Sequence, residues 1–189
     1  MSVQFAMPHR FTVDEFQRMG EAGIFSPDDR VELIEGEIIE MTPVGSRHVA
    51  CVIRLDNYFR ELLGREVVVS IQNPLQLEGS QPLPDVALLH PRADGYADDL
   101  PRPADCLLVV EVADTSFLLD RNSKRVAYAR AGIPEYWVVD LQANSVVVHR
   151  SPRGADYQTV KEHRVGESFV SPVLGGREVA VQQLVGTAR

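Results

Sequence analysis

The chain has 189 residues and contains 19 Lys and Arg against 27 Asp and Glu, which gives a formal net charge of −8. A hydrophobic content of 44% and a charged content of 24% are those of an ordinary globular protein, and they exclude wholesale disorder. No apolar run approaches the roughly 18 residues of a membrane span, and the acidic balance argues against tight non-specific binding to nucleic acid.

The charge is unevenly distributed along the chain. Residues 1–40 contain nine acidic residues and three arginines, so this segment carries −6 of the total charge of −8. Lysine occurs at only two positions, Lys124 and Lys161. Because lysine is so scarce, its position on a predicted helix invites a functional explanation.

Two cysteines bear on the class of protein. Cys51 and Cys106 both lie among apolar residues, a pattern that predicts reduced thiols in a core and favours neither a disulfide framework nor a zinc site. The first ten residues show no secretory pattern. We therefore expect a cytoplasmic protein of one domain over residues 1–189, with its core at about residues 31–150.

The N-terminal third predicts a helix, a hairpin and a longer helix. The first helix begins at a capping box formed by Thr12 and Glu15. The pair Glu35-Gly36 predicts the two-residue turn of the hairpin, and Gly64 is a typical residue at the end of a helix. The predicted ranges are 13 to about 19 for the first helix, 31–34 and 37–41 for the strands, and 46–63 for the longer helix.

The rest of the chain predicts strands and one more helix. Residues 106–112 are apolar almost without alternation, as in a strand that is covered on both faces, and the Pro- and Asp-rich residues 91–103 predict a surface loop. The other predictions are strands at 66–71, 75–77 and 85–89, a helix at 120–131, a hairpin at 136–140 and 146–150, and short strands within 169–184. Such alternation indicates an α/β fold, with a central mixed sheet flanked by helices.

Two carboxylates occupy unusual places in this pattern. Glu111 lies at the end of the most apolar strand, where an unpaired carboxylate is costly, so it needs a cation, a basic partner or an exposed strand end. Asp85 follows Pro84 and opens a strand, although a solvated aspartate in a turn is a simpler explanation. Two carboxylates on neighbouring strands can bind one divalent cation through oxygen.

A helix after the second carboxylate carries three polar residues on one face. Asp120, Lys124 and Tyr128 are spaced four residues apart, and an ordinary Asp–Lys pair within the helix is the simpler explanation. Next to two carboxylates, however, a lysine can orient a water or meet negative charge on a phosphate. Together these residues predict a candidate site for metal-dependent hydrolysis.

The order of these motifs resembles the Uma2 family, a family of predicted restriction endonucleases in the PD-(D/E)XK nuclease superfamily. The resemblance covers roughly residues 10–150. It implies a restriction-endonuclease-like core and an endonuclease that uses Mg²⁺, or Mn²⁺, to hydrolyse phosphodiester bonds in nucleic acid, DNA in particular. The motifs that carry it are Glu32 to Glu37, His48, Pro84-Asp85, Glu111 to Ser116, Asp120-Arg121 with Lys124, Tyr128, and Gly132 to Asp140.

The resemblance also implies roles for individual residues. The superfamily lysine would fall at position 113, which is Ala113, so its role is carried over to Lys124 on the following helix. Arg47, Arg54 and Arg130 are further basic residues available for phosphates. The implied roles are metal ligation by Asp85, Glu111 and Glu32, catalysis by Asp85, Glu111 and Lys124, support by His48, Asp120 and Tyr128, and backbone contact by Arg121 and Arg125.

Partners and alternatives follow from this interpretation. Enzymes that cut both strands of a duplex are commonly two-fold dimers, so we expect a homodimer and place its contact within residues 169–185. Two other functions stay open. One is a nuclease-fold domain that binds or regulates without catalysis, which Ala113 and the negative charge favour. The other is a hydrolase of smaller phosphate esters.

Overall fold

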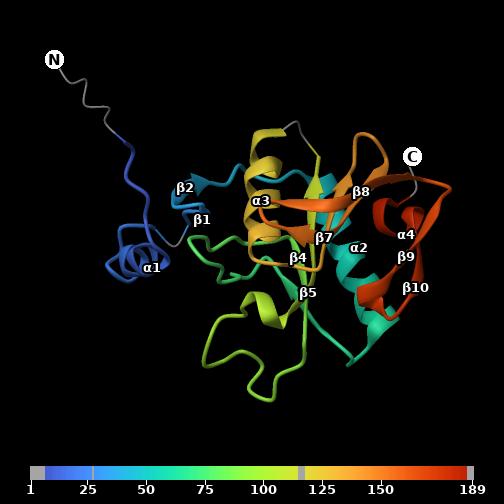
Figure 1. Ribbon diagram of the computed structural model, residues 1–189, viewed down its shortest axis with the longest axis horizontal. Coiled ribbons are helices and arrows are strands. Elements are labelled where there is room, and N and C mark those ends of the chain that lie inside the picture. The colour runs from blue at the N-terminus through green and yellow to red at the C-terminus, as the bar shows by residue number, and fades with distance from the viewer. Residues whose placement is uncertain (1–6, 27, 115–117, 187–189) are drawn as a thin grey trace.

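The fold is built around a six-stranded sheet with the strand order β3-β4-β5-β6-β7-β8. The computed structural model describes residues 7–26, 28–114 and 118–186, and in the helix after β5 it describes side chains from Asn122 onward. Helices flank the sheet, and a small N-terminal unit lies at one side of it (Figure 1). The strands are β3 (Val68–Ile71), β4 (Val86–Leu89), β5 (Cys106–Ala113), β6 (Glu135–Asp140), β7 (Ser145–Arg153) and β8 (Asp156–Arg164).

The sheet is mixed, as the sequence predicts. β5 and β6 run parallel, and the other neighbouring pairs are antiparallel. Parallel neighbours require a crossover connection, which α3 (Leu118–Arg130) provides between these two strands. The α/β class with a central mixed sheet flanked by helices is therefore confirmed.

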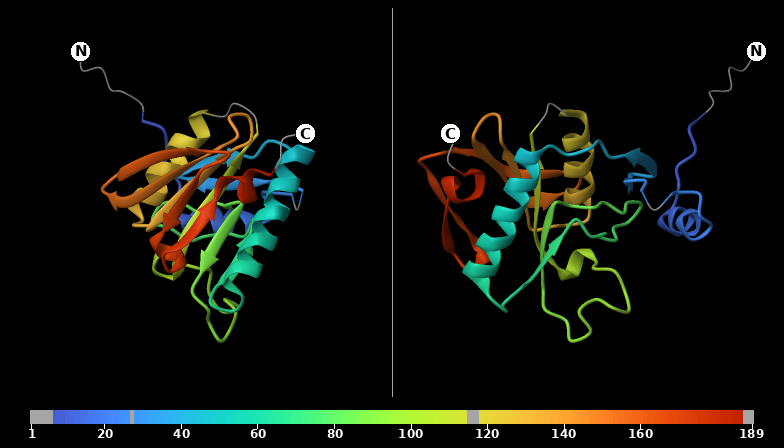
Figure 2. Two further views of the ribbon diagram at one scale, coloured as in Figure 1. Left: turned by 90° about the vertical axis from the view of Figure 1, so that its right-hand side faces the viewer. Right: turned by 180° about the vertical axis from the view of Figure 1, so that it is seen from behind.

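Helices cover both faces of the sheet, and this explains the apolar sequence of β5. On one face α2 (Ser46–Leu63) and α4 (Val181–Val185) pack on a cluster that includes Val110. On the other face α3 packs on a cluster that includes Val109 (Figure 2). Since successive side chains of a strand point to opposite faces, Glu111 is on the same side as Val109 and faces α3.

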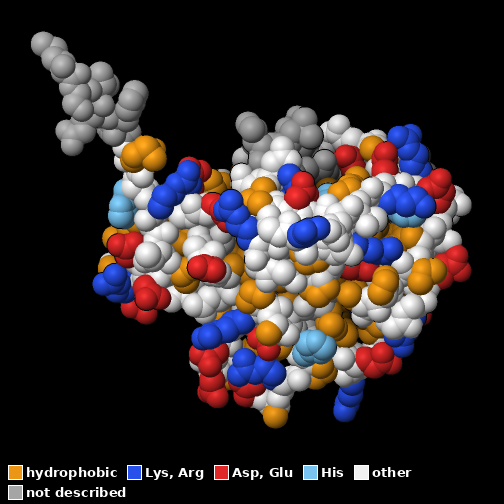
Figure 3. Space-filling view, viewed as in Figure 1, with side chains coloured by type: hydrophobic (Ala, Val, Ile, Leu, Met, Phe, Trp, Pro, Cys, Tyr) orange, Lys and Arg blue, Asp and Glu red, His pale blue; other side chains and the backbone are white. Residues whose placement is uncertain are grey.

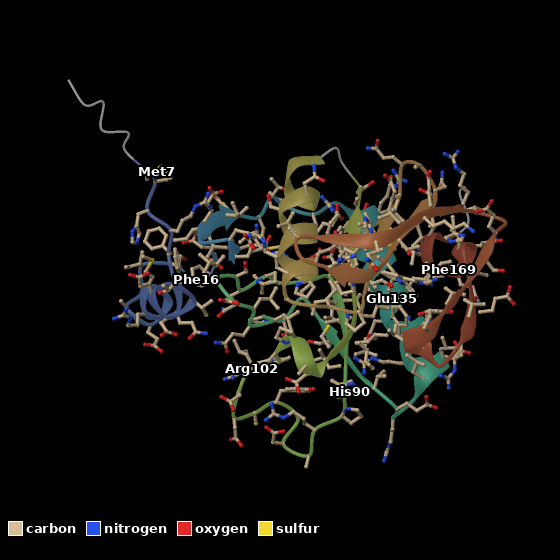
Figure 4. All side chains as sticks on the ribbon, viewed as in Figure 1. Met7, Phe16, His90, Arg102, Glu135 and Phe169 are labelled. Carbon is tan, nitrogen blue, oxygen red and sulfur yellow. The ribbon has the colours of Figure 1, made fainter. Side chains whose placement is uncertain are left out.

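The N-terminal unit forms as predicted. α1 (Val13–Glu21) begins at Thr12, whose hydroxyl accepts a hydrogen bond from the Glu15 amide while the Glu15 carboxylate accepts from the Thr12 amide. β1 (Val31–Ile34) and β2 (Glu37–Glu40) pair around a turn in which Glu35 and Gly36 both have positive φ. A small cluster around Phe16 fills this unit, at the left of the molecule in Figure 4.

Two predicted ranges are wrong, and one strand was not predicted. Residues 75–77 form no strand and make only an isolated bridge between Leu77 and Ser80. Residues 181–185 form α4, because Val181, Leu184 and Val185 share one buried helical face. β8 was not predicted, since its mostly exposed side chains give no alternation between apolar and polar residues.

The C-terminal segment packs one apolar face against the rest of the molecule. β9 (Ser168–Ser171) and β10 (Arg177–Ala180) form the predicted short strands as a separate hairpin, and Pro172–Leu174 forms a 3₁₀ turn. Phe169, Val179 and Leu184 are buried in the cluster under α2, and Figure 4 places Phe169 on this side of the sheet. The apolar pattern of residues 169–185 is therefore explained by the core of the chain itself.

A buried glutamate ties the C-terminal hairpin to the sheet. Glu135 on β6 accepts hydrogen bonds from the Trp137 indole at 2.8 Å and the Ser171 hydroxyl at 2.9 Å. The Arg150 guanidinium lies 2.8 Å from its other oxygen. The Glu-Tyr-Trp part of the sequence motif is therefore structural, and Trp137 is a core residue as predicted.

The cysteines are core residues. Cys51 and Cys106 are buried free thiols, and burial raises their pKa to about 11 and about 12, respectively. In the described part of the chain, no helix combines the length and the apolar character that crossing a membrane requires.

Candidate active site

Strand register brings the two predicted carboxylates to the same end of the sheet. Val86 of β4 pairs with Val110 of β5, so the next positions outward are Asp85 and Glu111. The amide of Val112 donates a hydrogen bond to Oδ2 of Asp85 at 2.8 Å, which draws Asp85 onto the end of β5. The fold thus places Asp85, which directly precedes β4, next to Glu111 on β5. Glu111 faces α3, and Asp85 contacts His48 of α2.

Three donors hold the Asp85 carboxylate, which is only 5% exposed. His48 Nε2 lies 3.0 Å from Oδ2, next to the Val112 amide, and the Gln72 side chain donates to Oδ1 at 3.0 Å. Burial alone raises the pKa of Asp85, but His48, the Val112 amide and Gln72 outweigh it and lower the pKa below its ordinary value. Asp85 is therefore an oriented, ionised carboxylate.

Of the two side chains that contact Asp85, His48 was predicted from the sequence and Gln72 was not. His48, in the first turn of α2, was predicted to support the site, and it contacts Asp85 directly. Burial lowers the pKa of His48, but the hydrogen bond and charge of Asp85 outweigh this and raise it. Gln72 was not predicted, because a glutamine after a strand has no distinctive spacing. Its positive φ and its contact with Asp85 appear only in the folded chain.

Glu111 contacts two residues of α3 through one oxygen. Lys124 Nζ lies 3.2 Å from Oε1, and the Tyr128 hydroxyl donates to the same oxygen at 2.8 Å. These contacts follow from the four-residue spacing of Lys124 and Tyr128, which places both on the face toward β5. The side chain of Asp120, the third residue of the predicted face, lies outside the described residues, as does that of Arg121.

Lys124 also joins the sheet to the N-terminal hairpin. Its ammonium lies 3.0 Å from Oε1 of Glu32 on β1, and the Leu83 amide donates to Oε2 of Glu32 at 3.0 Å. The Lys124 side chain is 7% exposed and that of Glu32 is fully buried. One ammonium is therefore held between two buried carboxylates that come from distant parts of the chain.

Burial gives Glu111 an unusual pKa of about 7. Desolvation is the main cause, and the negative charges of Asp85 and Glu32 act in the same direction. Lys124 and Tyr128 lower the pKa but do not outweigh burial. Glu111 is thus a carboxyl group that titrates near neutral pH before any cation neutralises it.

This pKa predicts how the stability of the metal-free protein depends on pH. Between the ordinary Glu value of 4.5 and about 7, Glu111 binds more protons in the folded than in the unfolded chain. Its contribution to the free energy of unfolding therefore falls as the pH rises through this window. In urea unfolding with a chelator present, the wild-type protein should lose more stability between pH 5 and pH 8 than Glu111→Gln. Equal losses would contradict the raised pKa.

The site opens into a pocket of about 890 Å³, within the size range of ligand pockets. Asp85, Glu111, Lys124 and His48 are among the residues that line it. Residues of the β1–β2 hairpin and residues 41–45, which lead into α2, line it as well. The candidate catalytic residues are therefore accessible to a ligand, although each is mostly buried.

The arginines considered for phosphate binding contact other parts of the protein. Arg125 forms an ion pair with Asp156 on β8, outside the residues that line this pocket. The remaining contacts are those of Arg54 with the carbonyls of Leu184 and Val185, of Arg47 with Asp114 and the carbonyl of Leu141, and of Arg130 with Glu35.

The donors at the site suit a hard divalent cation. The described residues contain no group of three or more His, Cys, Asp or Glu side chains that could hold a metal ion. Mg²⁺, however, keeps several waters and is usually held by one or two carboxylates. Lys124 and Tyr128 both contact Oε1 of Glu111, and within the described part of the chain no hydrogen bond occupies Oε2. Asp85 and Glu111 together fit this requirement.

Comparisons with known proteins agree with this reading of the fold. The model of the Uma2 family, described as "Putative restriction endonuclease", matches residues 13–182. The crystal structure of a putative nuclease belonging to DUF820 from Anabaena variabilis ATCC 29413 superposes with a TM-score of 0.75 at 16% sequence identity, over 93% of this chain and 97% of that one. At this identity the likeness shows the fold alone. No curated protein matches the chain.

Proposed function

Because the chain belongs to the Uma2 family of putative restriction endonucleases and has a nuclease-like fold, we propose that it is a metal-dependent endonuclease that cleaves phosphodiester bonds in DNA. The observation that carries the proposal is the arrangement of Asp85 and Glu111 on adjacent strands with Lys124 beside them. Two carboxylates and one ammonium thus line the same pocket, which supports the proposal that a metal ion and a phosphate bind there.

Asp85 and Glu111 would hold the metal. Mg²⁺, or Mn²⁺ in its place, would supply positive charge for a phosphate oxygen and lower the pKa of a water. His48, Gln72 and the Val112 amide fix the Asp85 carboxylate in one orientation. The Tyr128 hydroxyl does the same for one oxygen of Glu111. This preorganisation means that the ligands need little rearrangement on binding.

Lys124 would take the part of the superfamily lysine, because position 113 is an alanine. Its ammonium lies 3.2 Å from Glu111, so it would be within reach of a phosphate whose oxygen is held by a metal ion at that carboxylate, and it could stabilise the charge that develops there. Glu32, predicted as a third ligand, has one oxygen at Lys124 and the other at the Leu83 amide. We therefore assign Glu32 to positioning Lys124.

A binding domain without catalysis is the second candidate. The observation in its favour is that the Lys124 ammonium is held by both Glu32 and Glu111, which lowers its freedom to meet a phosphate. Such a domain would bind nucleic acid without cutting it and would show no thermal shift with Mn²⁺.

Incubation of the purified protein with plasmid DNA, single-stranded DNA and RNA, each with Mg²⁺ or Mn²⁺, tests the proposal. We expect internal cleavage of DNA that depends on the divalent ion and stops when a chelator is added. The absence of cleavage with every polymer and either ion would contradict the proposal. Light scattering of the same sample tests the proposed two-fold dimer. The buried apolar residues of the C-terminal segment already pack in the core, so they do not form its contact.

A further inference from the structure

A second pocket adjoins the one that holds the candidate catalytic residues. It has a volume of about 870 Å³ and lies between the start of α1, the tip of the β1–β2 hairpin and the C-terminal end of α3. Arg10 and Glu35 line both pockets. The two pockets are therefore neighbours on one surface, separated by the tip of the hairpin.

Helix α3 connects the two pockets. Lys124 lines the first, and Ala127 and Ala131 line the second. These residues are three and seven positions apart, so they follow one face of the helix, and the small side chains leave space above it. From Lys124 to Arg130 the helix axis rises by about 9 Å. An extended ligand that starts at the catalytic residues can thus continue along α3.

Two guanidinium groups converge on Glu35 between the pockets. Arg10 donates to the Glu35 carbonyl oxygen at 2.9 Å and pairs with Glu37 at 2.8 Å, and Arg130 pairs with the Glu35 carboxylate. The side chains of Arg10 and Arg130 are 54% and 55% exposed. Exposed ion pairs contribute little to stability, so exchange of the carboxylate for another anion costs little. In Figure 3 basic and acidic side chains gather where the N-terminal unit meets α3.

We propose that the second pocket binds the nucleic-acid strand beyond the cleaved bond, and that Arg130 holds one backbone phosphate where the Glu35 carboxylate now sits, with Arg10 next to it at the Glu35 carbonyl. Guanidinium groups bind phosphate and carboxylate with the same paired geometry, so Glu35 occupies the place of the phosphate in the free protein. One strand of B-form DNA carries a phosphate per about 3.4 Å of helix axis, so in that conformation the bound phosphate would lie about two to three nucleotides from the cleaved bond. This inference rests on the proposed function.

The remaining lining is partly apolar and partly polar. Apolar side chains are available for contact with a sugar or a base, and the other polar lining residues are Thr12, Gln76 and the acidic Asp14 and Glu78. The acidic N-terminal segment gains a role as well, since Glu35 competes with the ligand and keeps the basic residues neutralised until a strand binds. The apolar lining residues are Phe11, Val13, Leu77, Pro103, Ala127 and Ala131.

The test compares Arg130→Gln with Glu35→Gln. Binding of a fluorescent single-stranded DNA oligonucleotide is followed by anisotropy with a chelator present, so that cleavage does not interfere. Arg130→Gln should weaken binding about tenfold and reduce the slope of log K against log salt by about 0.7, as for one lost phosphate contact. Glu35→Gln should instead tighten binding, because it removes the competing charge while both guanidinium groups remain.

Arg164→Gln is the control. Arg164, at the end of β8, is an exposed arginine that also pairs with an acidic residue, Glu162, and it lines neither pocket, so its loss should leave affinity unchanged. If the pair at Glu35 only holds the hairpin, Arg130→Gln and Glu35→Gln will both lower the melting temperature and neither will change affinity as predicted. That result overturns the inference and leaves the nuclease proposal intact. A wild-type protein that neither binds nor cuts nucleic acid would overturn both.

Discussion

Lys124→Met is expected to lower the free energy of unfolding by about 3–5 kcal/mol, as for other buried ion pairs that lose one partner. Lys124 lies 3.0 Å from Glu32 and 3.2 Å from Glu111, and the Glu32 side chain is fully buried. Without the ammonium, two carboxylates remain in a low-dielectric environment and repel each other. Urea denaturation at pH 8, where both carboxylates are ionised in the unfolded chain, measures the loss.

The chain provides a matched control for this substitution. Its other lysine, Lys161, is exposed in the edge strand β8, so Lys161→Met should change the free energy of unfolding by less than about 0.5 kcal/mol. The double variant Glu32→Gln with Lys124→Met should recover part of the lost stability, because one of the two buried negative charges is removed. A loss below about 1 kcal/mol for Lys124→Met alone would contradict the buried ion-pair network.

Asp85→Asn is expected to reduce metal-dependent cleavage at least 100-fold, because loss even of a group that only supports a metal ligand costs about 10- to 100-fold. Asparagine preserves the shape of the side chain, and its carbonyl oxygen can still accept from His48 and the Val112 amide, the two donors that contact Oδ2 of Asp85. The negative charge that would hold the metal is lost. Cleavage rates with Mn²⁺, measured beside the thermal shift that Mn²⁺ produces, separate loss of the metal from loss of the fold.

The interpretation of this variant depends on two comparisons. Asp156→Asn removes a surface aspartate that pairs with Arg125, and it should cleave like the wild-type protein. Asp85→Asn should melt cooperatively and within a few degrees of the wild-type protein when no metal is present. If Asp85→Asn cut as fast as its parent, Asp85 would not be a metal ligand and the proposed site would be wrong.

Local sequence rules account for much of the fold. The capping box at Thr12, the turn at Glu35-Gly36 and the amphipathic helix 46–63 each depend on residues close together in the chain, and the structure confirms all three. β8 shows where these rules fail. An edge strand with both faces largely exposed has no hydrophobic pattern, so only its pairing with β7 defines it.

The candidate site divides in the same way. The spacing of Lys124 and Tyr128, and the cost of an unpaired Glu111 in an apolar strand, were visible in the sequence, since each depends on residues within one element or one turn of the chain. Three other features of the site were not visible in the sequence. They are the contact of Gln72 with Asp85, the contact of Glu32 with Lys124, and the convergence of Arg10 and Arg130 on Glu35. These contacts join residues up to 95 positions apart, and no local pattern records which distant side chains a fold will bring together. The sequence by itself thus determined the elements and the chemical types at the site. The strand register and the packing of the hairpin on α3 decided which of them meet.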